Sequence, residues 1–400
     1  MGSISADYLI ETRIANLSKD IDALYKDVGN DEASRKQLMG VILGAMSKVE
    51  SPMETIWRII MSPHAPAALM VMIRSGVLTA LVSANKPMTA TELATSTGTS
   101  STLIIRMMRP LTALGIFHET DVYTYASSPI SELLTAPPLM GGYQFMFDLA
   151  TRSLANMPRY LEKTGFQHVD AAPGPFQDCN NTEDGMFQYL IKNPKIMTNF
   201  NAFMAGSLEE RLDWFNTWDA QSIIINGAKK DHEAVLLVDV AGGEGHDVQA
   251  FGRAFPDAPG KLVLEDLPPV IDNIKALDSK IVRQPHDFFT EQPIKGARAY
   301  YVRNIFHDWP NEKCVEIMKQ LAAAMEKGYS KLLIFEWILP AKGVPLYPAL
   351  LDVNMLTLLN GRERTEDEWS NLLTQAGLKI VKVRKVSDEA EGLMEVELAD

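Results

Sequence analysis

The second half of the chain alternates short apolar runs with stretches of helical periodicity, and no other feature limits the possible folds as strongly. The apolar runs are "AVLLVDV", "KLVLED", "AYYVRNIF" and "KLLIFEWIL", and "HDVQAFGRAF" separates the first two. Strands that alternate with helices form an open, mostly parallel sheet. The final runs, "KIVKVRKVSD" and "GLMEVELA", predict an antiparallel pair at one sheet edge. We therefore expect an α/β domain over residues 231–400.

The first 135 residues predict a separate domain that is mainly helical. "APAALMVMIRSGVLTALVSA" is apolar nearly all round, which predicts a single helix buried on most sides. A helix of this kind often packs against a second subunit, so we expect a homodimer formed through the N-terminal domain. An earlier stretch, "YLIETRIANLSKDIDALYKDV", places apolar side chains at helical spacing. They are Leu9, Ile14, Leu17, Ile21 and Leu24.

Residues 88–128 have the outline of a winged helix, which is a helix, a turn, a second helix and a hairpin. The hairpin runs are "IFHE" and "VYTYA", and the second helix begins near Ser100. Such a module can bind DNA, or it can serve dimerisation and the substrate pocket. The second helix carries only Arg106 and Arg109, and the net charge of the chain is -13. Because phosphate binding depends on Lys and Arg, we expect no nucleic-acid partner.

Residues 136–230 predict a helical region that links the two domains and contributes to a substrate pocket. Aromatic and methionine side chains are dense in this region. They fit a protein core, and they equally fit a pocket for a large apolar substrate. The set comprises Tyr143, Phe145, Met146, Phe147, Met186, Phe187, Tyr189, Phe200, Phe203, Met204, Trp214, Phe215 and Trp218.

Composition and the N-terminal sequence predict a cytoplasmic protein. Two cysteines, Cys179 and Cys314, cannot form a disulfide framework or a zinc-type cluster. "MGSISADYLIETRI" lacks the apolar run of a signal peptide. We expect no membrane span, because no stretch reaches the roughly 20 apolar residues that one needs. The net charge of -13 also argues against an anionic membrane surface as a partner.

A glycine-rich loop follows the first apolar run of the α/β domain. The loop reads "AGGEGHDV", so Gly243 and Gly245 let the backbone approach a ligand closely, beside the N-terminus of the next helix. The dinucleotide pattern requires a third glycine where Val248 stands, which weakens a nicotinamide interpretation. The second run ends in Glu265 and Asp266, and an acidic residue there can accept both hydroxyls of a ribose. Together these features favour an adenosine cofactor.

Six blocks then follow one another in a characteristic order. They read "LLVDVAGGEGHDVQAF", "LVLEDLPPVI", "PHDFF", "VRNIFHDWPNEKC", "FEWILP" and "NGRERTEDEW". Over residues 230–398 the chain resembles the class I S-adenosylmethionine-dependent O-methyltransferases, in the group that includes plant caffeic-acid and flavonoid enzymes and their fungal relatives. The resemblance implies an α/β fold, with a C-terminal Rossmann-like methyltransferase sheet and an N-terminal all-α and winged-helix dimerisation domain. It also implies S-adenosyl-L-methionine as the cofactor and a small molecule as the substrate.

The resemblance implies roles for particular residues. His307 takes the position of the general base, with Asp308 beside it, and Glu336 and Glu363 orient the imidazole. Met355 and Phe145 are the expected substrate contacts. No metal is expected, because no cluster of Asp and Glu ligands stands out in the sequence. The expected cofactor contacts are Asp239, Gly243, Gly245, Asp266, Leu267, Asp287, Phe288 and Arg303.

The chemistry of methyl transfer agrees with a histidine in this position. A phenol with a pKa near ~10 is mostly protonated at neutral pH, so a base within hydrogen-bond distance is needed. Histidine, with an ordinary pKa of about 6.5, suits that role. The alternative is that His307 is a packed structural imidazole and that Glu363 is a solvated charge in "RERTEDE".

The chain departs from the plant enzymes in two places. Ala241 replaces the commoner glycine of the loop, which is a small change, and the N-terminal segments match the plant enzymes poorly. We therefore expect a phenol, enol or hydroxypyridone rather than a phenylpropanoid. A second function stays open, because some fungal proteins that resemble this family bind S-adenosylmethionine without transferring its methyl and guide dehydration and pericyclic ring closure. The apolar, methionine-rich pocket, including Met355, suits that function as well.

Overall fold

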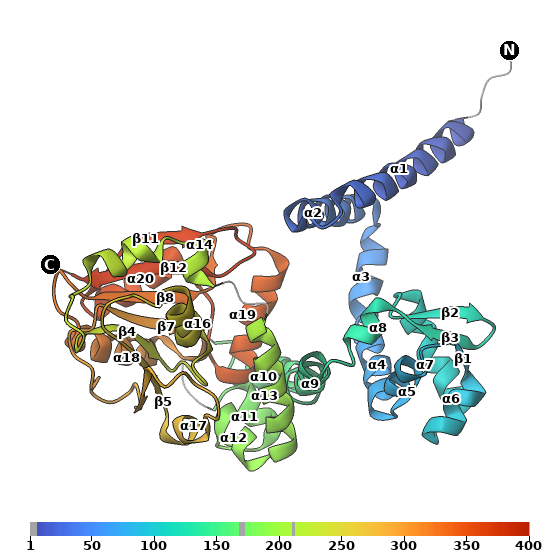
Figure 1. Cartoon of the computed structure of the whole chain (residues 1–400). Helices are drawn as coiled ribbons and strands as arrows, with labels where there is room; N and C mark the ends of the chain where they lie inside the picture. Colours follow the sequence, from blue (N-terminus) through green and yellow to red (C-terminus); the bar gives the residue numbers. More distant parts are fainter. Residues whose placement is uncertain (1–5, 168–172, 210–212, 400) are drawn as a thin grey trace.

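The computed structural model describes residues 6–167, 173–209 and 213–399. Figure 1 shows a helical N-terminal part and a C-terminal part built around a sheet, with helices of the middle region between them. The N-terminal part begins with α1 (Ala6–Val28), α2 (Glu32–Val49) and α3 (Pro52–Met61). The predicted division into a helical region and an α/β domain is therefore visible in the arrangement of the elements.

Residues 64–127 form the winged-helix outline. The first element of the predicted apolar helix, α4 (His64–Arg74), ends before Gly76, and α5 (Val77–Ala84) follows. The expectation of one continuous helix is wrong, because Gly76 adopts a left-handed backbone with φ of 76° that no helix interior accepts. The rest of the module has β1 (Met88–Thr89), α6 (Ala90–Thr97), α7 (Ser101–Ala113), β2 (Phe117–Asp121) and β3 (Thr124–Ser127). Its sheet has the order β1-β3-β2.

The middle region is helical, as expected. Its helix α13 packs closely along α9, and rings of both helices meet there, with Phe145 and Phe200 at 5.1 Å between centroids. The elements are α8 (Pro129–Leu133), α9 (Pro137–Phe145), η1 (Met146–Thr151), α10 (Arg152–Lys163), α11 (Pro175–Asn180), α12 (Met186–Lys192), α13 (Pro194–Glu209), α14 (Trp214–Thr217), α15 (Ala220–Ile223) and η2 (Ile225–Gly227).

The C-terminal domain contains a seven-stranded sheet with the order β11-β12-β8-β7-β4-β5-β6. Pairs from β8 to β6 are parallel, whereas β12 is antiparallel to both β8 and β11, so the predicted edge pair is confirmed. One strand was not predicted, because "IVRQP" at the other edge is short and has only two β-prone residues, Ile281 and Val282. The strands are β4 (Val235–Val240), β5 (Lys261–Asp266), β6 (Ile281–Pro285), β7 (Ala299–Arg303), β8 (Lys331–Glu336), β11 (Leu378–Lys385) and β12 (Gly392–Leu398).

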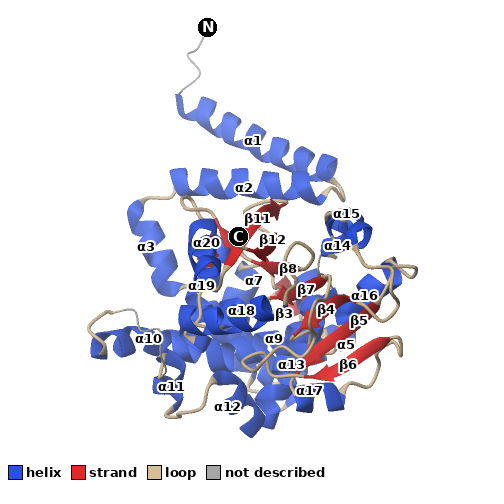
Figure 2. Cartoon of the chain, turned by 90° about the vertical axis from the view of Figure 1, so that its left-hand side faces the viewer, coloured by secondary structure: helices blue, strands red, loops and turns tan. Residues whose placement is uncertain are grey.

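Helices cover both faces of this sheet, as Figure 2 shows. On one face, α18 (Asn311–Ala324) and α20 (Glu366–Gln375) pack on alternate strand residues such as Tyr300 and Val302. On the other face, α14, α15 and α16 (His246–Ala254) pack on the intervening residues, such as Tyr301. Because consecutive side chains of a buried strand point to opposite faces, the all-apolar runs of the sequence serve two cores. The remaining elements of the domain are α17 (Pro268–Asn273), η3 (Phe306–Asp308), β9 (Ile338–Leu339), α19 (Leu346–Leu359) and β10 (Arg364–Thr365).

The first three helices expose many apolar side chains. In α1 three residues of the predicted stripe, Leu9, Ile14 and Leu17, are more than half exposed. Within the described part of the chain, the stretch Pro52–Arg74 is long and apolar enough to cross a membrane by length and composition, so the expectation that no stretch qualifies is wrong. The same criteria also accept core helices, and five residues of α4 are buried in the winged-helix core.

Candidate active site

His307 lies at the carboxyl end of β7, in the centre of the sheet. The strand ends at Arg303, and Asn304 then adopts a left-handed backbone with φ of 51°, which turns the chain sharply into η3. The Asn304 amide donates a hydrogen bond of 3.1 Å to the carbonyl oxygen of Phe335 on the neighbouring strand. His307 is therefore presented at the edge where α/β folds build their active sites.

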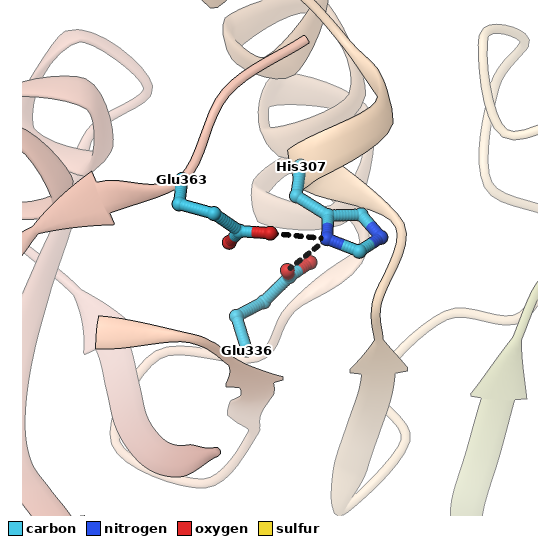
Figure 3. A group of neighbouring side chains, drawn as sticks. All are labelled: His307, Glu336 and Glu363. Carbon is cyan, nitrogen blue, oxygen red and sulfur yellow. Dashed lines mark hydrogen bonds and ion pairs between the residues drawn. The ribbon is translucent and has the colours of Figure 1, made fainter. Parts of the chain in front are cut away.

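Two glutamates from separate elements reach the same imidazole nitrogen, as Figure 3 shows. Oε1 of Glu363 lies 2.8 Å from Nδ1 of His307, which is a hydrogen bond. The nearest oxygen of Glu336 lies 3.9 Å from Nδ1, too far for one. Instead, Oε1 of Glu336 accepts hydrogen bonds from the amides of Ile305 and Phe306 at 2.9 and 2.8 Å. The two glutamates therefore have different partners: Glu363 binds the imidazole ring, and Glu336 binds the backbone of the turn that precedes it.

A third carboxylate lies on the other side of the ring. Oδ1 of Asp308 is 3.4 Å from Nε2 of His307. The imidazole is well shielded, with 12% of its side chain exposed, and neither glutamate side chain is exposed at all. The structure therefore brings together all four residues that the resemblance named as catalytic, although their roles stay predictions.

The charges in this cluster shift the pKa of each member. Burial alone would lower the pKa of His307, but the charges of Glu336 and Asp308 and the hydrogen bond that the imidazole donates to Glu363 outweigh it and raise the pKa to about 10. Burial raises the pKa of Asp308 to about 6 and that of Glu336 to about 7. Near neutral pH the imidazole is consequently protonated on both nitrogens.

The glycine loop and the end of β5 form one continuous edge. Gly243 has a left-handed backbone with φ of 61°, and a Cβ added there would meet no atom within 4 Å. Its amide donates a hydrogen bond of 2.8 Å to Oδ2 of Asp266, whose pKa burial raises. Gly245 caps α16, and the buried Asp239 accepts a bond of 3.3 Å from the amide of Val248. An open glycine backbone beside a buried carboxylate fits the ribose and methionine parts of S-adenosylmethionine.

Three further expected cofactor contacts, Leu267, Asp287 and Phe288, lie on the segments that follow β5 and β6. Leu267 is 49% exposed at the start of α17, and the ring of Phe288 packs against that of Trp309. Asp287 accepts a hydrogen bond of 3.0 Å from the amide of Phe289. Cofactor contacts by these residues stay predictions.

Arg303 is buried and interacts with other residues of the protein. It forms ion pairs with Asp247 at 3.3 Å and Glu391 at 2.7 Å, and its guanidinium lies 4.4 Å above the ring of Phe335. These partners lie on the α16 side of the sheet and at the start of β12. The expected cofactor contact of Arg303 stays a prediction, and the sequence did not predict this network of ion pairs.

The two expected substrate contacts are buried in the structure. Phe145 is 3% exposed and belongs to a cluster that includes Phe176, Met186 and Leu358 of α19. Met355, also on α19, is 7% exposed. The cluster joins the middle region to the catalytic domain, which supports the core interpretation of these aromatics as much as the pocket interpretation.

The described residues contain one group that could hold a metal ion, and it is the cluster itself. One ligand atom each of His307, Glu336 and Glu363 lies within 4.8 Å of the others. The sequence predicted that these three residues would meet, but it did not predict a group that could hold a metal ion. Oε1 of Glu336 accepts from two amides and Oε1 of Glu363 binds the imidazole, whereas Oε2 of each glutamate is buried without a hydrogen-bond partner. The absence of a metal requirement stays a prediction.

Sequence reasoning missed several polar residues around the cluster. Glu391, from the acidic turn before β12, accepts a hydrogen bond of 2.5 Å from Asn304. Asp352 accepts a bond of 2.8 Å from the amide of Glu363. Arg364, 1% exposed, binds the turn that carries His307. Only Arg364 and Asn304 could have been noticed in the sequence, because they lie inside two of the six blocks. The sequence around Glu391 and Asp352 gives no indication that they lie near the site.

Two family models match the chain. An O-methyltransferase domain matches residues 185–379, and an O-methyltransferase dimerisation domain matches residues 57–137. O-methyltransferase asqD of Emericella nidulans is 38% identical over 312 residues, which are 77% of this chain and 80% of that protein. The chain therefore belongs to the S-adenosylmethionine-dependent O-methyltransferase family of fungal secondary metabolism. The dimerisation-domain match supports the expected homodimer.

Solved structures agree along nearly the whole chain. A pericyclic reaction enzyme aligns with a TM-score of 0.87 and 26% identity, covering 97% of this chain and 100% of that one. The structure of LepI in complex with SAM aligns equally well, with a TM-score of 0.87, 26% identity and coverage of 97% and 99%. The predicted fold class and the cofactor, S-adenosyl-L-methionine, are confirmed.

Proposed function

We propose that this enzyme methylates a hydroxyl group of a small, largely apolar secondary metabolite such as a phenol, an enol or a hydroxypyridone. The observation that carries the proposal is the 2.8 Å contact between Glu363 and Nδ1 of His307. It fixes the ring so that Nε2 points away from both glutamates (Figure 3), toward the place where a substrate hydroxyl would lie. A base oriented by a carboxylate suits removal of a proton from a weakly acidic hydroxyl.

The residues of the chain would divide the work as follows. Gly243, Asp266 and the start of α16 would hold the cofactor, which supplies an electrophilic methyl group when bound. Nε2 of His307 would take the hydroxyl proton, and Glu363 would stabilise the resulting imidazolium. Because the pKa of His307 is about 10, a small fraction of the enzyme has a neutral imidazole at neutral pH. Turnover should therefore increase with pH.

A second candidate function is a pericyclase of the same fold, which binds S-adenosylmethionine and guides dehydration and hetero-Diels-Alder or ene-type ring closure without methyl transfer. Two observations favour it. The chain aligns with a pericyclic reaction enzyme at a TM-score of 0.87. In addition, the raised pKa of His307 keeps the imidazole protonated near neutral pH, so it can donate a proton to a leaving hydroxyl or a hydrogen bond to a substrate carbonyl.

One experiment separates the two functions. The enzyme is incubated with S-adenosylmethionine that carries a labelled methyl group and with a panel of phenols, enols and hydroxypyridone-type alcohols, and mass spectrometry follows both. A labelled product with an equal amount of S-adenosylhomocysteine supports methyl transfer. Intact cofactor together with a dehydrated or isomerised substrate supports the pericyclase and contradicts the first proposal.

A further inference from the structure

Arg364 is a fully buried arginine at the start of β10, directly after Glu363 in the sequence. Its side chain is 1% exposed. Nη1 donates a hydrogen bond of 3.0 Å to the carbonyl oxygen of Phe306, and Nη2 donates one of 2.8 Å to that of Trp309. Nε donates a third bond of 3.0 Å to the side chain of Asn311. One guanidinium therefore spans the whole turn that carries His307.

The turn is held from two sides by side chains of opposite charge. Glu336 accepts from the amides that enter the turn, at Ile305 and Phe306. Arg364 donates to the carbonyls within and after it, at Phe306 and Trp309. Buried charges persist where hydrogen bonds satisfy them, and this pair satisfies backbone groups that would otherwise lack partners in the core.

The backbone of the same segment adds a third attachment. The amide of Arg362 donates a hydrogen bond of 2.9 Å to the carbonyl oxygen of His307. A Cβ placed on Gly361 would lie 2.0 Å from that oxygen, so the segment approaches the turn as closely as a backbone can. Residues 361–364 thus contact His307 through its ring, by way of Glu363, and through its main chain.

We infer that Arg364 is a positioning residue, which fixes the turn of residues 306–309 so that His307 and Glu363 keep the geometry that turnover requires. The inference rests on the proposed role of His307. Because guanidinium presents several donors in a rigid fork, it can bind Phe306, Trp309 and Asn311 at once. An ammonium group on a flexible stem cannot reproduce that fork, so Arg364→Lys removes the restraint and keeps the charge.

The test compares Arg364→Lys with a matched change elsewhere. Arg298 is also buried, and it also donates to backbone carbonyls, at Ile224 over 3.0 Å and at Ile223 over 3.1 Å. It lies at the opposite end of the sheet, just before β7. Arg298→Lys therefore costs similar hydrogen bonds without touching the site. Three quantities are measured for both variants: the melting temperature, the dissociation constant for S-adenosylmethionine, and kcat.

We expect Arg364→Lys to lower kcat by about 10²-fold, since a displacement near 1 Å can cost that much, while binding of S-adenosylmethionine stays within about threefold. Arg298→Lys should lower only the melting temperature. Equal kcat losses in the two variants, or a kcat within about threefold of wild type in Arg364→Lys, would overturn the inference. If Arg364→Lys binds no cofactor, Arg364→Gln, which still offers two donors, is measured against the same two outcomes.

A second readout does not depend on methyl transfer. The Hε1 resonance of His307 is titrated by NMR in wild type and in Arg364→Lys. If Arg364 fixes the turn, its loss loosens the contact with Glu363, and the pKa of His307 moves down toward 6.5. An unchanged titration would contradict the inference even in a protein that proves to be a pericyclase. A failure of the proposed function would instead appear in the wild-type enzyme, as intact cofactor.

Discussion

Glu363 and His307 are 56 residues apart in the sequence, and yet Oε1 of one lies 2.8 Å from Nδ1 of the other. The contact forms because β10, which follows Glu363, lies beside β9, which continues the chain after β8. The glutamate therefore reaches the imidazole from a part of the chain that is distant from η3 in the sequence. This relationship determines what each substitution in the cluster should do.

Removal of the imidazole is the most direct check of the proposed base. His307→Ala should lower kcat by ~10²-fold or more, because general acid–base catalysis by a positioned side chain contributes at least that factor. Binding of S-adenosylmethionine, measured by calorimetry, should stay close to wild type. A kcat within about threefold of wild type would exclude His307 as the base. The exposed His64 provides the control, since His64→Ala should change neither quantity.

Glu363→Gln should change the pH dependence of turnover. The carboxylate favours the charged imidazole, so its loss lowers the pKa of His307 from about 10 toward 6.5. If His307 acts as a base, the neutral form is active and the rising limb of the kcat–pH profile moves to lower pH in the variant. If it acts as an acid, the falling limb moves to lower pH instead. A profile that keeps its position would show that Glu363 does not control the protonation of His307.

The stability of the folded protein should respond to the same group. The pKa of His307 is raised above its unfolded value, so the stability it contributes is complete below about pH 6.5 and is lost as the pH rises toward 10. Urea unfolding at several pH values should therefore show a smaller decline between pH 7 and pH 10 in His307→Gln than in wild type. Parallel declines would contradict the direction of the shift.

Asp266→Asn should weaken cofactor binding. The carboxylate accepts a hydrogen bond of 2.8 Å from Gly243, and its loss changes a charge-assisted contact at the loop that would face the ribose. A hydrogen bond to a charged group is worth about 1.5 to 3 kcal/mol, which corresponds to about 10- to 100-fold in the dissociation constant. Calorimetry with S-adenosylmethionine measures this change. Asp272→Asn, on the exposed side of α17, should leave the constant as it was.

Chelation should not affect turnover. His307, Glu336 and Glu363 lie close enough together to hold an ion, and Oε2 of each glutamate has no hydrogen-bond partner, but Nδ1 of His307 already forms a hydrogen bond with Oε1 of Glu363. Dialysis against EDTA should leave kcat unchanged, and added Zn²⁺ should not increase it. Loss of activity on dialysis that a divalent metal restores would mean that the cluster is a metal centre.

Local pattern was sufficient to predict the sheet but not its surroundings. Runs such as "AVLLVDV" are apolar and long enough to be strands of any parallel sheet, and the order of six blocks related them to one family. The edge strand β6 was not predicted, because an edge strand needs few apolar residues. Gly76 separates α4 from α5, and the apolar pattern of the sequence did not predict this break.

The sequence predicted which residues form the candidate site, but it did not predict which group each glutamate binds. His307, Glu336 and Glu363 each lie in a recognisable block, so their convergence could be expected. That Glu336 binds the amides of the turn, and Glu363 the ring, depends on distances that only the fold determines. Glu391 comes from an acidic turn that looks like solvent-exposed charge, and only the antiparallel return of β12 beside β8 brings it to Asn304.

We expect the apolar surface of α1, α2 and α3 to make the state of this enzyme depend on its concentration. Isolated helices gain little from hydrogen bonding alone, and most of their stability comes from packing an apolar face. In a single chain, Ile14, Leu17 and Val41 are left more than half exposed to water. In a homodimer that covers them, helix formation and association become one equilibrium, displaced by mass action. Dilution should therefore reduce the helical signal of circular dichroism before it affects the core around Trp214 and Trp369.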